Sequence, residues 1–482
     1  MDMVESNTNT KSPTRPRTAK TSTYYCQNGS LPSALQIPGD ALDDPSGNYY
    51  MEPPSKRIRT APDRLSDLPD CLIQSILSLL ESQQVVRLSV LSRRWRHLWR
   101  SVPCIDIDLT LFRRRDRCQD QNCCNTEHGL TKTTCKKEWQ PFEEFGNNLL
   151  LLNSDARSLD KLRIHVPALG SDDRQARDAC SRWVKRGINC SPCVVIDVHL
   201  EFAPTLGWVF LPDLGSNSSR LTRLLLHGVS LDGAFAKQLC SGCPLLEELS
   251  LTKCAYQFGK ILSILSRSLR HLTIADCFMW EGVVVTAPRL TSLRASLSTI
   301  SCPYDICVTD ISSSVSASIC VSTFSQISVS TFGHINANFW EKLRTIFNVK
   351  HLELVGRMMD KIEWISDKVP KFQNVRTLVI NRYTLTSKAN IQALDRFLQS
   401  TPSLKKLTLQ NREFSYNSKR RAARAKWRHV ALESQHLMSF KCDNLELIEI
   451  KHREDDNVDE LFELLMGLWR NLGKANIKLT KV

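Results

Sequence analysis

The sequence predicts an α/β protein in which a small helical domain precedes a long array of strand-containing repeats. Between positions 63 and 103, apolar residues recur at helical spacing, and a proline lies near each end of the stretch. Further along the chain, a short apolar motif returns at positions 221, 246, 269 and 290. At 482 residues, the chain is long enough to hold both parts.

Residues 1–62 are rich in Ser, Thr, Pro and Asn and contain few large apolar side chains. Such a composition cannot bury enough surface to fold, so we expect a disordered tail. At its end, Lys56, Arg57 and Arg59 fit a short basic nuclear-import signal. The alternative is a solvated charge cluster that flanks a folded domain.

Residues 63–108 are expected to form a domain of three short helices. Pro69 suits the first helical position, and Asp70 places negative charge at the positive end of the helix dipole. The apolar faces of the three helices comprise Leu72, Ile73, Ile76, Leu77 and Leu80, then Val85, Val86 and Leu88, then Leu91, Trp95, Leu98, Trp99 and Val102. Helices this short bury little surface by themselves, which implies a partner.

This stretch resembles the plant-type F-box. The resemblance is carried by Leu68-Pro69, Ile76-Leu77, the run from Val90 to Trp95, and Leu98-Trp99 followed by Val102-Pro103. It implies docking onto a Skp-family adaptor, which joins the protein to a cullin scaffold and a ubiquitin ligase. The adaptor-binding residues that it implies are Leu68, Pro69, Leu72, Ile76, Leu80, Val90 and Trp95. The alternative is a helical hairpin packed on the chain's own core.

An alternating strand begins at Cys104, and residues 109–152 are expected to form a linker or insert. Within residues 113–137, thiols and an imidazole are close enough in sequence to suggest zinc: Cys118, Cys123, Cys124, His128 and Cys135. Paired C-x₂-C knuckles are missing, however, and adjacent cysteines are awkward for a closed site. We therefore expect a charged loop and no metal.

Residues 153–482 carry the repeated unit L-x-x-L-x-L. Clear copies begin at Leu159, Leu221, Leu246, Leu269, Leu290, Val349, Val375, Leu404 and Leu445, and weaker ones at Val195 and Leu472. The spacing is that of leucine-rich repeats, whose short strands turn alternate apolar side chains inward and stack into a solenoid. Cys254 and Cys277 follow two copies at a position that should also turn inward. The Ser-rich residues 298–332 are expected to continue the array.

Together these features resemble the plant F-box proteins with leucine-rich repeats. Residues from about 400 to 482 also resemble FBD, a C-terminal module of many such proteins, with His452–Asn457 in place of its Gly-rich turn.

Composition and motifs argue against a membrane-spanning protein, a disulfide-stabilised secreted protein and an enzyme of several common classes. No apolar run approaches the roughly 20 residues of a membrane span, and the 18 cysteines form no regular disulfide framework, so reduced thiols in the nucleus or cytoplasm are expected. The sequence contains no G-x-S-x-G, no Gly-rich phosphate loop and no H-E-x-x-H. We therefore expect a non-catalytic chain without a cofactor.

The resemblance implies a substrate-recognition subunit of a Skp–cullin–F-box E3 ubiquitin ligase, whose repeats bind an unidentified protein target. One alternative is a solenoid interaction scaffold without ligase activity. Another is a nuclear nucleic-acid-associated protein that uses the basic segment 411–429, although we do not expect nucleic acid to be a partner. In that segment Lys419, Arg420 and Arg421 are further candidates for nuclear import.

Overall fold

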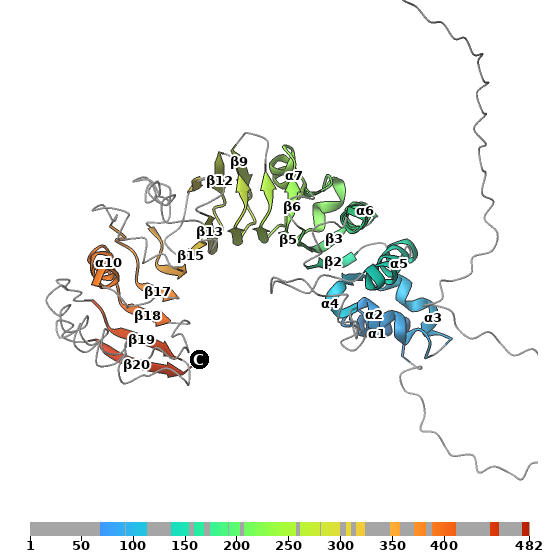
Figure 1. Cartoon of the computed structure of the whole chain (residues 1–482), viewed down its shortest axis with the longest axis horizontal. Helices are drawn as coiled ribbons and strands as arrows, with labels where there is room; N and C mark the ends of the chain where they lie inside the picture. Colours follow the sequence, from blue (N-terminus) through green and yellow to red (C-terminus); the bar gives the residue numbers. More distant parts are fainter. Residues whose placement is uncertain are drawn as a thin grey trace, which may run out of the picture. The chain divides into compact units, whose positions relative to one another are not determined.

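The computed structural model has mixed α/β architecture, with helices near the N-terminus followed by a strand-rich region (Figure 1). It describes residues 68–91, 93–112, 136–153, 159–167, 174–190, 192–202, 207–256, 261–279, 281–298, 305–309, 315–322, 348–356, 371–381, 388–410, 444–452 and 475–481. Among these residues, no helix is both long and apolar enough to cross a membrane.

The helical domain begins with α1 (Asp70–Leu77) and α2 (Ser82–Leu88), in agreement with the helical spacing. The third helix is shorter than expected, because α3 (Trp95–Leu98) gives way to the 3₁₀ helix η1 (Trp99–Ser101). Pro69 precedes α1 and does not occupy its first turn, since its ψ of 147° is extended. Asp70 does lie in the first turn, as predicted.

In the described residues the main sheet has 13 strands, and each pairs with its neighbours in parallel. Its strands, in spatial order, are β1 (Cys104–Asp108), β2 (Leu159–Val166), β3 (Cys193–Leu200), β5 (Arg223–His227), β7 (Glu248–Thr252), β10 (His271–Ala275), β13 (Ser292–Ser298), β15 (Ser316–Ser322), β16 (His351–Gly356), β17 (Thr377–Asn381), β18 (Lys406–Gln410), β19 (Leu447–His452) and β20 (Asn476–Lys481). Spatial order follows chain order, as expected when neighbouring repeats stack.

The register confirms the clear copies of the motif. Leu224, Leu249 and Leu272 lie opposite one another on β5, β7 and β10, and all three are buried. The Ser-rich region also contributes a main strand, because β15 pairs with both β13 and β16.

Both weak copies lie two residues away from their predicted positions. Ile196, and not Val198, lies opposite Leu162, so the copy on β3 runs through Cys193, Ile196 and Val198. On β20, Ile477 and Leu479 lie opposite Ile448 and Ile450, where the predicted copy had placed Ala475 and Ile477. In these copies small or polar residues occupy motif positions, so apolar pattern alone did not fix the register.

The sheet begins earlier than predicted. β1 pairs with β2 through five residue pairs, from Cys104–Lys161 to Asp108–His165. Val102, Ile105 and Ile107 are buried and form a further copy of the motif, which sequence inspection missed. The parallel sheet therefore starts inside the predicted helical domain and not after residue 153.

The predicted linker contains helices that belong to the core. These are α4 (Leu109–Phe112) and α5 (Lys136–Leu152), and α5 packs against α6 (Arg174–Cys190). Ring contacts join the two longer helices, with centroids 5.9 Å apart for Trp139–Trp183 and 5.5 Å for Phe142–Trp183. Burial of these aromatic rings accounts for the ordered packing of this part of the segment.

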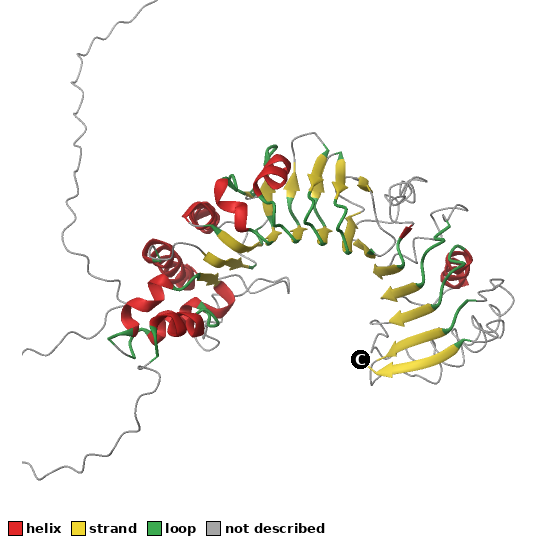
Figure 2. Ribbon diagram, turned by 180° about the vertical axis from the view of Figure 1, so that it is seen from behind, coloured by secondary structure: helices red, strands yellow, loops and turns green. Residues whose placement is uncertain are grey.

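Two smaller sheets and further helices complete the described structure. In Figures 1 and 2, α6, α7 and α10 lie on the same side of the main strands. The remaining elements are η3 (Ser216–Arg220), α7 (Phe235–Gly242), α10 (Lys388–Gln399), a sheet of β11 (Phe278–Met279), β8 (Ala255–Tyr256), β6 (Val229–Leu231) and β4 (Val209–Phe210), and a sheet of β14 (Asp305–Thr309), β12 (Gly282–Thr286) and β9 (Leu262–Leu265).

A left-handed residue follows three consecutive main strands and turns the chain into the smaller sheet. Gly228, Lys253 and Asp276 have φ angles of 70°, 47° and 52°. After two of these turns, Cys254 and Cys277 are fully buried, as predicted. The Cys254 thiol donates to the carbonyl of Leu226 on the preceding strand (3.4 Å).

The turn after β5 has no room for a side chain. A Cβ on Gly228 would lie 1.8 Å from the carbonyl oxygen of Leu200, in addition to the strain of its positive φ. We predict that Gly228→Ala lowers the free energy of unfolding by about 3 kcal/mol or more, measured by urea denaturation. Gly215→Ala is the matched control, since its φ is also positive but no atom lies within 4 Å. Gly215→Ala should cost only the backbone strain of about 1–3 kcal/mol, because its φ of 53° and ψ of −160° disfavour a side chain. Equal losses in the two variants would contradict the steric explanation.

Candidate functional site

Helix α1 separates its apolar residues onto two faces. Ile73 and Leu77 are buried, whereas Leu72 and Ile76 keep 49% and 42% of their surface exposed. Residues four apart lie on the same side of a helix, so the exposed pair forms an outward stripe. Exposed apolar side chains gathered on so small a domain indicate a binding surface.

Three further apolar residues of the helical domain are exposed. Leu79 lies just beyond α1 and is 85% exposed, while Val90 and Leu91 follow α2 and are 67% and 70% exposed. We call Leu72, Ile76, Leu79, Val90 and Leu91 the exposed apolar set. Sequence inspection did not assign Leu79 and Leu91 to the surface, although Leu79 follows Leu72 at a spacing of seven, which is two helical turns.

The other predicted adaptor-binding residues have different surroundings. Pro69 is exposed. Leu68, Leu80 and Trp95 are partly buried and pack against the core, so most of their apolar surface contacts the chain itself.

Arg94 fixes the start of α1. Its Nε donates to Asp70 Oδ1 (3.0 Å), and its Nη2 donates to the carbonyl oxygen of Leu68. At the other side of α1, Gln74 Nε2 donates to Ser101 Oγ (2.9 Å). These bonds hold α1 against the segment that contains α3 and η1, and so set the orientation of the exposed apolar set.

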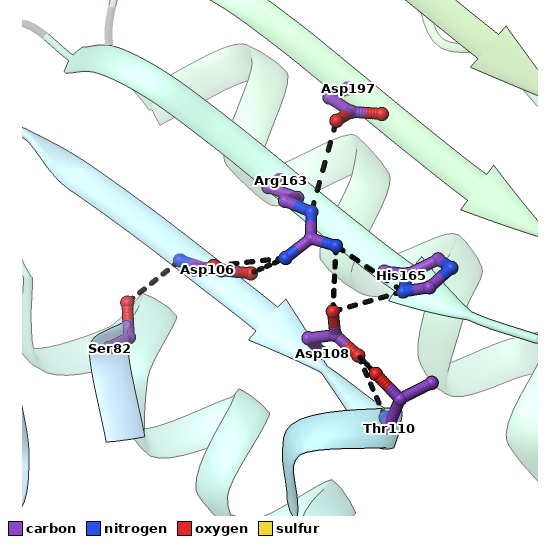
Figure 3. Close-up of polar contacts among 7 residues, drawn as sticks. All are labelled: Ser82, Asp106, Asp108, Thr110, Arg163, His165 and Asp197. Atoms are coloured by element: carbon purple, nitrogen blue, oxygen red, sulfur yellow. Dashed lines mark hydrogen bonds and ion pairs between the residues drawn. The ribbon is translucent and has the colours of Figure 1, made fainter. Parts of the chain in front are cut away.

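A polar network joins the helical domain to the first strands of the sheet (Figure 3). The backbone N–H of Asp106 on β1 donates to Ser82 Oγ at the start of α2 (2.8 Å). On the same strand, the Asp108 carboxylate accepts from the backbone N–H and the hydroxyl of Thr110 (2.7 and 2.6 Å).

Arg163 on β2 is the centre of this network. Its guanidinium lies 3.3 Å from Asp106 Oδ2, 2.8 Å from Asp108 Oδ2 and 3.9 Å from Asp197 Oδ2 on β3. The three carboxylates come from β1 and β3, so a single cation bridges three strands (Figure 3). The side chain of Asp108 is only 2% exposed, which makes its charge dependent on these partners.

Burial raises the pKa of the carboxylates in this network, whereas pairing with cations and hydrogen-bond donors lowers it. Burial raises the pKa of Asp106, and the Arg163 charge only partly offsets it. At Asp108 burial also acts upward, but hydrogen bonds from Thr110 and His165 outweigh it and lower the pKa. Asp108 is therefore the more firmly ionised partner of Arg163.

Three histidines continue from Asp108 across the sheet at one register position. His165 Nδ1 lies 3.0 Å from Asp108 Oδ2. The ring centroids of His165 and His199 are 4.6 Å apart, and those of His199 and His227 are 3.9 Å apart and nearly parallel. Burial, reinforced by the charge that His199 would carry, lowers the pKa of His227 to about 4. The pKa of His199 is also lowered, mainly by burial.

This row of imidazoles shows no metal-binding geometry. In the part of the chain that the structure describes, no three His, Cys, Asp or Glu side chains are placed to hold a metal ion. His199 and His227 are nearly parallel, so these two rings cannot direct their nitrogen lone pairs at one point. Beside the row, Lys253 Nζ donates to Glu201 Oε1 (2.6 Å), and this bond lowers the pKa of Glu201.

Several predicted features lie outside the described residues. They are the tail 1–62 with Lys56, Arg57 and Arg59, the stretch 113–135 of the Cys-rich segment, and the basic segment 411–429 with Lys419, Arg420 and Arg421.

Comparison with protein families agrees with the helical domain and the repeats. Residues 65–106 match the F-box domain, and residues 200–314 match the family described as FBD-associated F-box protein At5g56370, LRR repeats. The F-box match ends within β1.

Curated relatives extend the similarity over most of the chain. The MEIOTIC F-BOX protein MOF of Oryza sativa subsp. japonica is 30% identical over 437 residues, which cover 85% of this chain and 84% of that protein. The putative F-box/LRR-repeat protein At3g18150 of Arabidopsis thaliana is 27% identical, with coverage of 77% and 76%. The FBD-associated F-box protein At4g13985 of Arabidopsis thaliana is 28% identical over 52% of this chain and 55% of that protein.

The chain belongs to the plant F-box proteins with leucine-rich repeats. The F-box is the helical domain that bears the exposed apolar set, and the leucine-rich repeats supply β5, β7, β10 and β13 within the matched range. The Arg163 network lies where the F-box meets the first strands.

Removal of Arg163 should destabilise this F-box junction. In Arg163→Met the buried Asp108 keeps its hydrogen bonds but loses its cation, so we predict a loss of about 2–4 kcal/mol in the free energy of unfolding. Arg223→Met is the control, because the pair Arg223–Glu248 is well exposed and should contribute less than about 1 kcal/mol. Equal losses in denaturant titrations would show that the junction has no special role.

The histidine row should make stability depend on pH. A folded-state pKa below the unfolded value of about 6.5 means that the unfolded chain binds more protons between those values. The contribution of these histidines to the free energy of unfolding should therefore be fully present above about pH 6.5 and should decrease as the pH drops toward 4. The groups facing the row are Asp108, Arg163, Asp197, Glu201 and Lys253.

Solvent screening reduces the effect, so we expect His227 to account for on the order of 1 kcal/mol between pH 6.5 and 5. Thermal unfolding followed across this range should show a smaller pH dependence in His227→Gln than in the unmodified chain. Identical pH profiles would contradict the assignment.

Proposed function

We propose that this chain is the substrate-recognition subunit of a Skp–cullin–F-box E3 ubiquitin ligase. The F-box binds the Skp-family adaptor, and the leucine-rich repeats bind a protein target for ubiquitination. The F-box match over residues 65–106, together with the exposed apolar set on that same domain, is the observation that carries the proposal.

The energetics of the exposed apolar set support an adaptor interface. Leu72, Ile76 and Val90 were expected to face the adaptor and are each at least 42% exposed. A Leu, Ile or Val side chain contributes on the order of 1.5–3 kcal/mol when it is fully buried against a partner. Since α1 is held by the bonds from Arg94 and Gln74, little further ordering is required for binding.

The repeats supply the second binding function of the proposal. We propose that they stack as a solenoid and present the outward side chains of the main strands to the target. No catalytic group is required in such a subunit, because acyl transfer takes place on the ubiquitin-charged E2. The chain contributes proximity, which raises the effective concentration of the target lysine near the thioester.

The adaptor interface is tested by a paired truncation on α1. Leu72→Ala with Ile76→Ala should weaken binding of the purified Skp-family adaptor by about 10–100-fold, measured by isothermal titration calorimetry. Both side chains point away from the core, so the thermal midpoint should change little.

Leu245→Ala is the matched control, because Leu245 is 54% exposed but lies after α7 in the repeats. Its adaptor affinity should equal that of the unmodified chain. Undiminished binding by the α1 double variant would refute the assigned surface, and absence of adaptor binding by the unmodified chain would refute the proposed function.

A further inference from the structure

The outward side chains of three central strands form a nearly uncharged surface. On β10, β13 and β15, outward residues alternate with the buried apolar positions, and the register places the three sets side by side. We call this surface the central strand face. Its members are His271, Thr273, Ala275, Ser292, Arg294, Ser316, Ser318 and Cys320. Ser296 is not a member, because it is buried and its hydroxyl donates to Asp276 just after β10 (2.7 Å).

On the strands at either side, outward charges pair with each other. Arg163 is shared among three carboxylates near the F-box, and Arg223 Nε lies 2.6 Å from Glu248 Oε2 on the neighbouring strand. Toward the C-terminus, Lys406 Nζ lies 2.7 Å from Glu449 Oε2. Arg223–Glu248 and Lys406–Glu449 are neutral pairs, whereas the three carboxylates around Arg163 outnumber its single positive charge. None of these groups therefore offers an unpaired positive charge to a partner.

Arg294 differs from these cations. It is exposed, and among the described residues it makes no ion pair or side-chain hydrogen bond. It is also the only member of the central strand face with a formal charge when the histidine is neutral. Thr273 and Ser318 lie directly opposite it on the two neighbouring strands.

We propose that the central strand face binds an extended acidic segment of the target protein, with a carboxylate seated on Arg294. The planar guanidinium presents N–H groups that match the two oxygens of a carboxylate. This inference rests on the proposed function, because it names the chemistry of the target that the repeats would capture.

The neighbours of Arg294 suit an extended main chain. The hydroxyls of Thr273 and Ser318 can both donate and accept, as the N–H and C=O groups of an extended segment require. Their small size also lets a partner backbone approach the strands, leaving the guanidinium as the longest side chain on the surface. Glu353 on β16 lies opposite Ser318, two strands or about 10 Å from Arg294, and would repel acids placed further along.

A charge-reversal selection tests the proposal without knowledge of the target. A display library of random linear peptides is selected on the full chain and, in parallel, on Arg294→Glu. The unmodified chain should enrich peptides with Asp or Glu at one position, and Arg294→Glu should enrich Lys or Arg there. Common sequences from both selections, enrichment of apolar or basic peptides on the unmodified chain, or no binding peptide at all would overturn the proposal.

A synthetic peptide from the first selection then locates the contact. Its affinity, measured by fluorescence anisotropy, should fall about tenfold or more for Arg294→Gln. An Asp→Asn or Glu→Gln change in the peptide should cause the same loss, and the two changes together should cause little more than either alone. Additive losses would show that the two groups do not meet.

Arg289→Gln is the matched control. Arg289 is an exposed arginine in the turn before β13, and its substitution removes the same positive charge as Arg294→Gln. Its affinity should remain within about twofold of the unmodified chain. If Arg289→Gln lowers the affinity as much as Arg294→Gln, the loss reflects the net charge of the protein and not a contact with Arg294. That result would refute the proposed site. Since no step uses the adaptor, a failed adaptor titration with a successful peptide selection would reject the ligase assignment alone.

Discussion

The pairing of β1 with β2 is the constraint on which the rest of the structure depends. Through this pairing the F-box ends in the first strand of the main sheet, and Ile105 and Ile107 enter the same core as Leu162 and Ile164. Because β1 follows η1 almost directly, the helices that bear the exposed apolar set are bound to the sheet by backbone hydrogen bonds as well as by the Ser82–Asp106 contact.

Successive side chains of each strand point alternately into the core and out of it, and this direction determines the role of each residue. Inward positions are apolar in nearly every repeat and make the core, whereas outward positions carry side chains of many kinds. Near the F-box the outward residues pair with one another around Arg163, which gives stability to the junction. In the central repeats they are mostly small and polar, which leaves Arg294 available to a partner.

The sequence was a good guide where apolar residues were large and regular. It located α1, α2 and the strands that carry clear copies of the motif, because large apolar side chains at those positions are buried in the core. It misplaced the motif by two residues on β3, where the small residue Cys193 holds the first motif position, and on β20. It predicted the strand that begins at Cys104, but it did not show that Val102, Ile105 and Ile107 form a copy of the motif and begin the main sheet. The Arg163 network could not be foreseen, since its partners are adjacent only once the register across three strands is known.

The central claim is that the F-box surface and the strand face serve two different partners. Hydrogen–deuterium exchange of the full chain with and without the Skp-family adaptor tests it most directly. We predict slower exchange in α1 and in residues 89–91 on adaptor binding, with no change in β10, β13 and β15. Protection of these strands by the adaptor, with α1 unaffected, would contradict it.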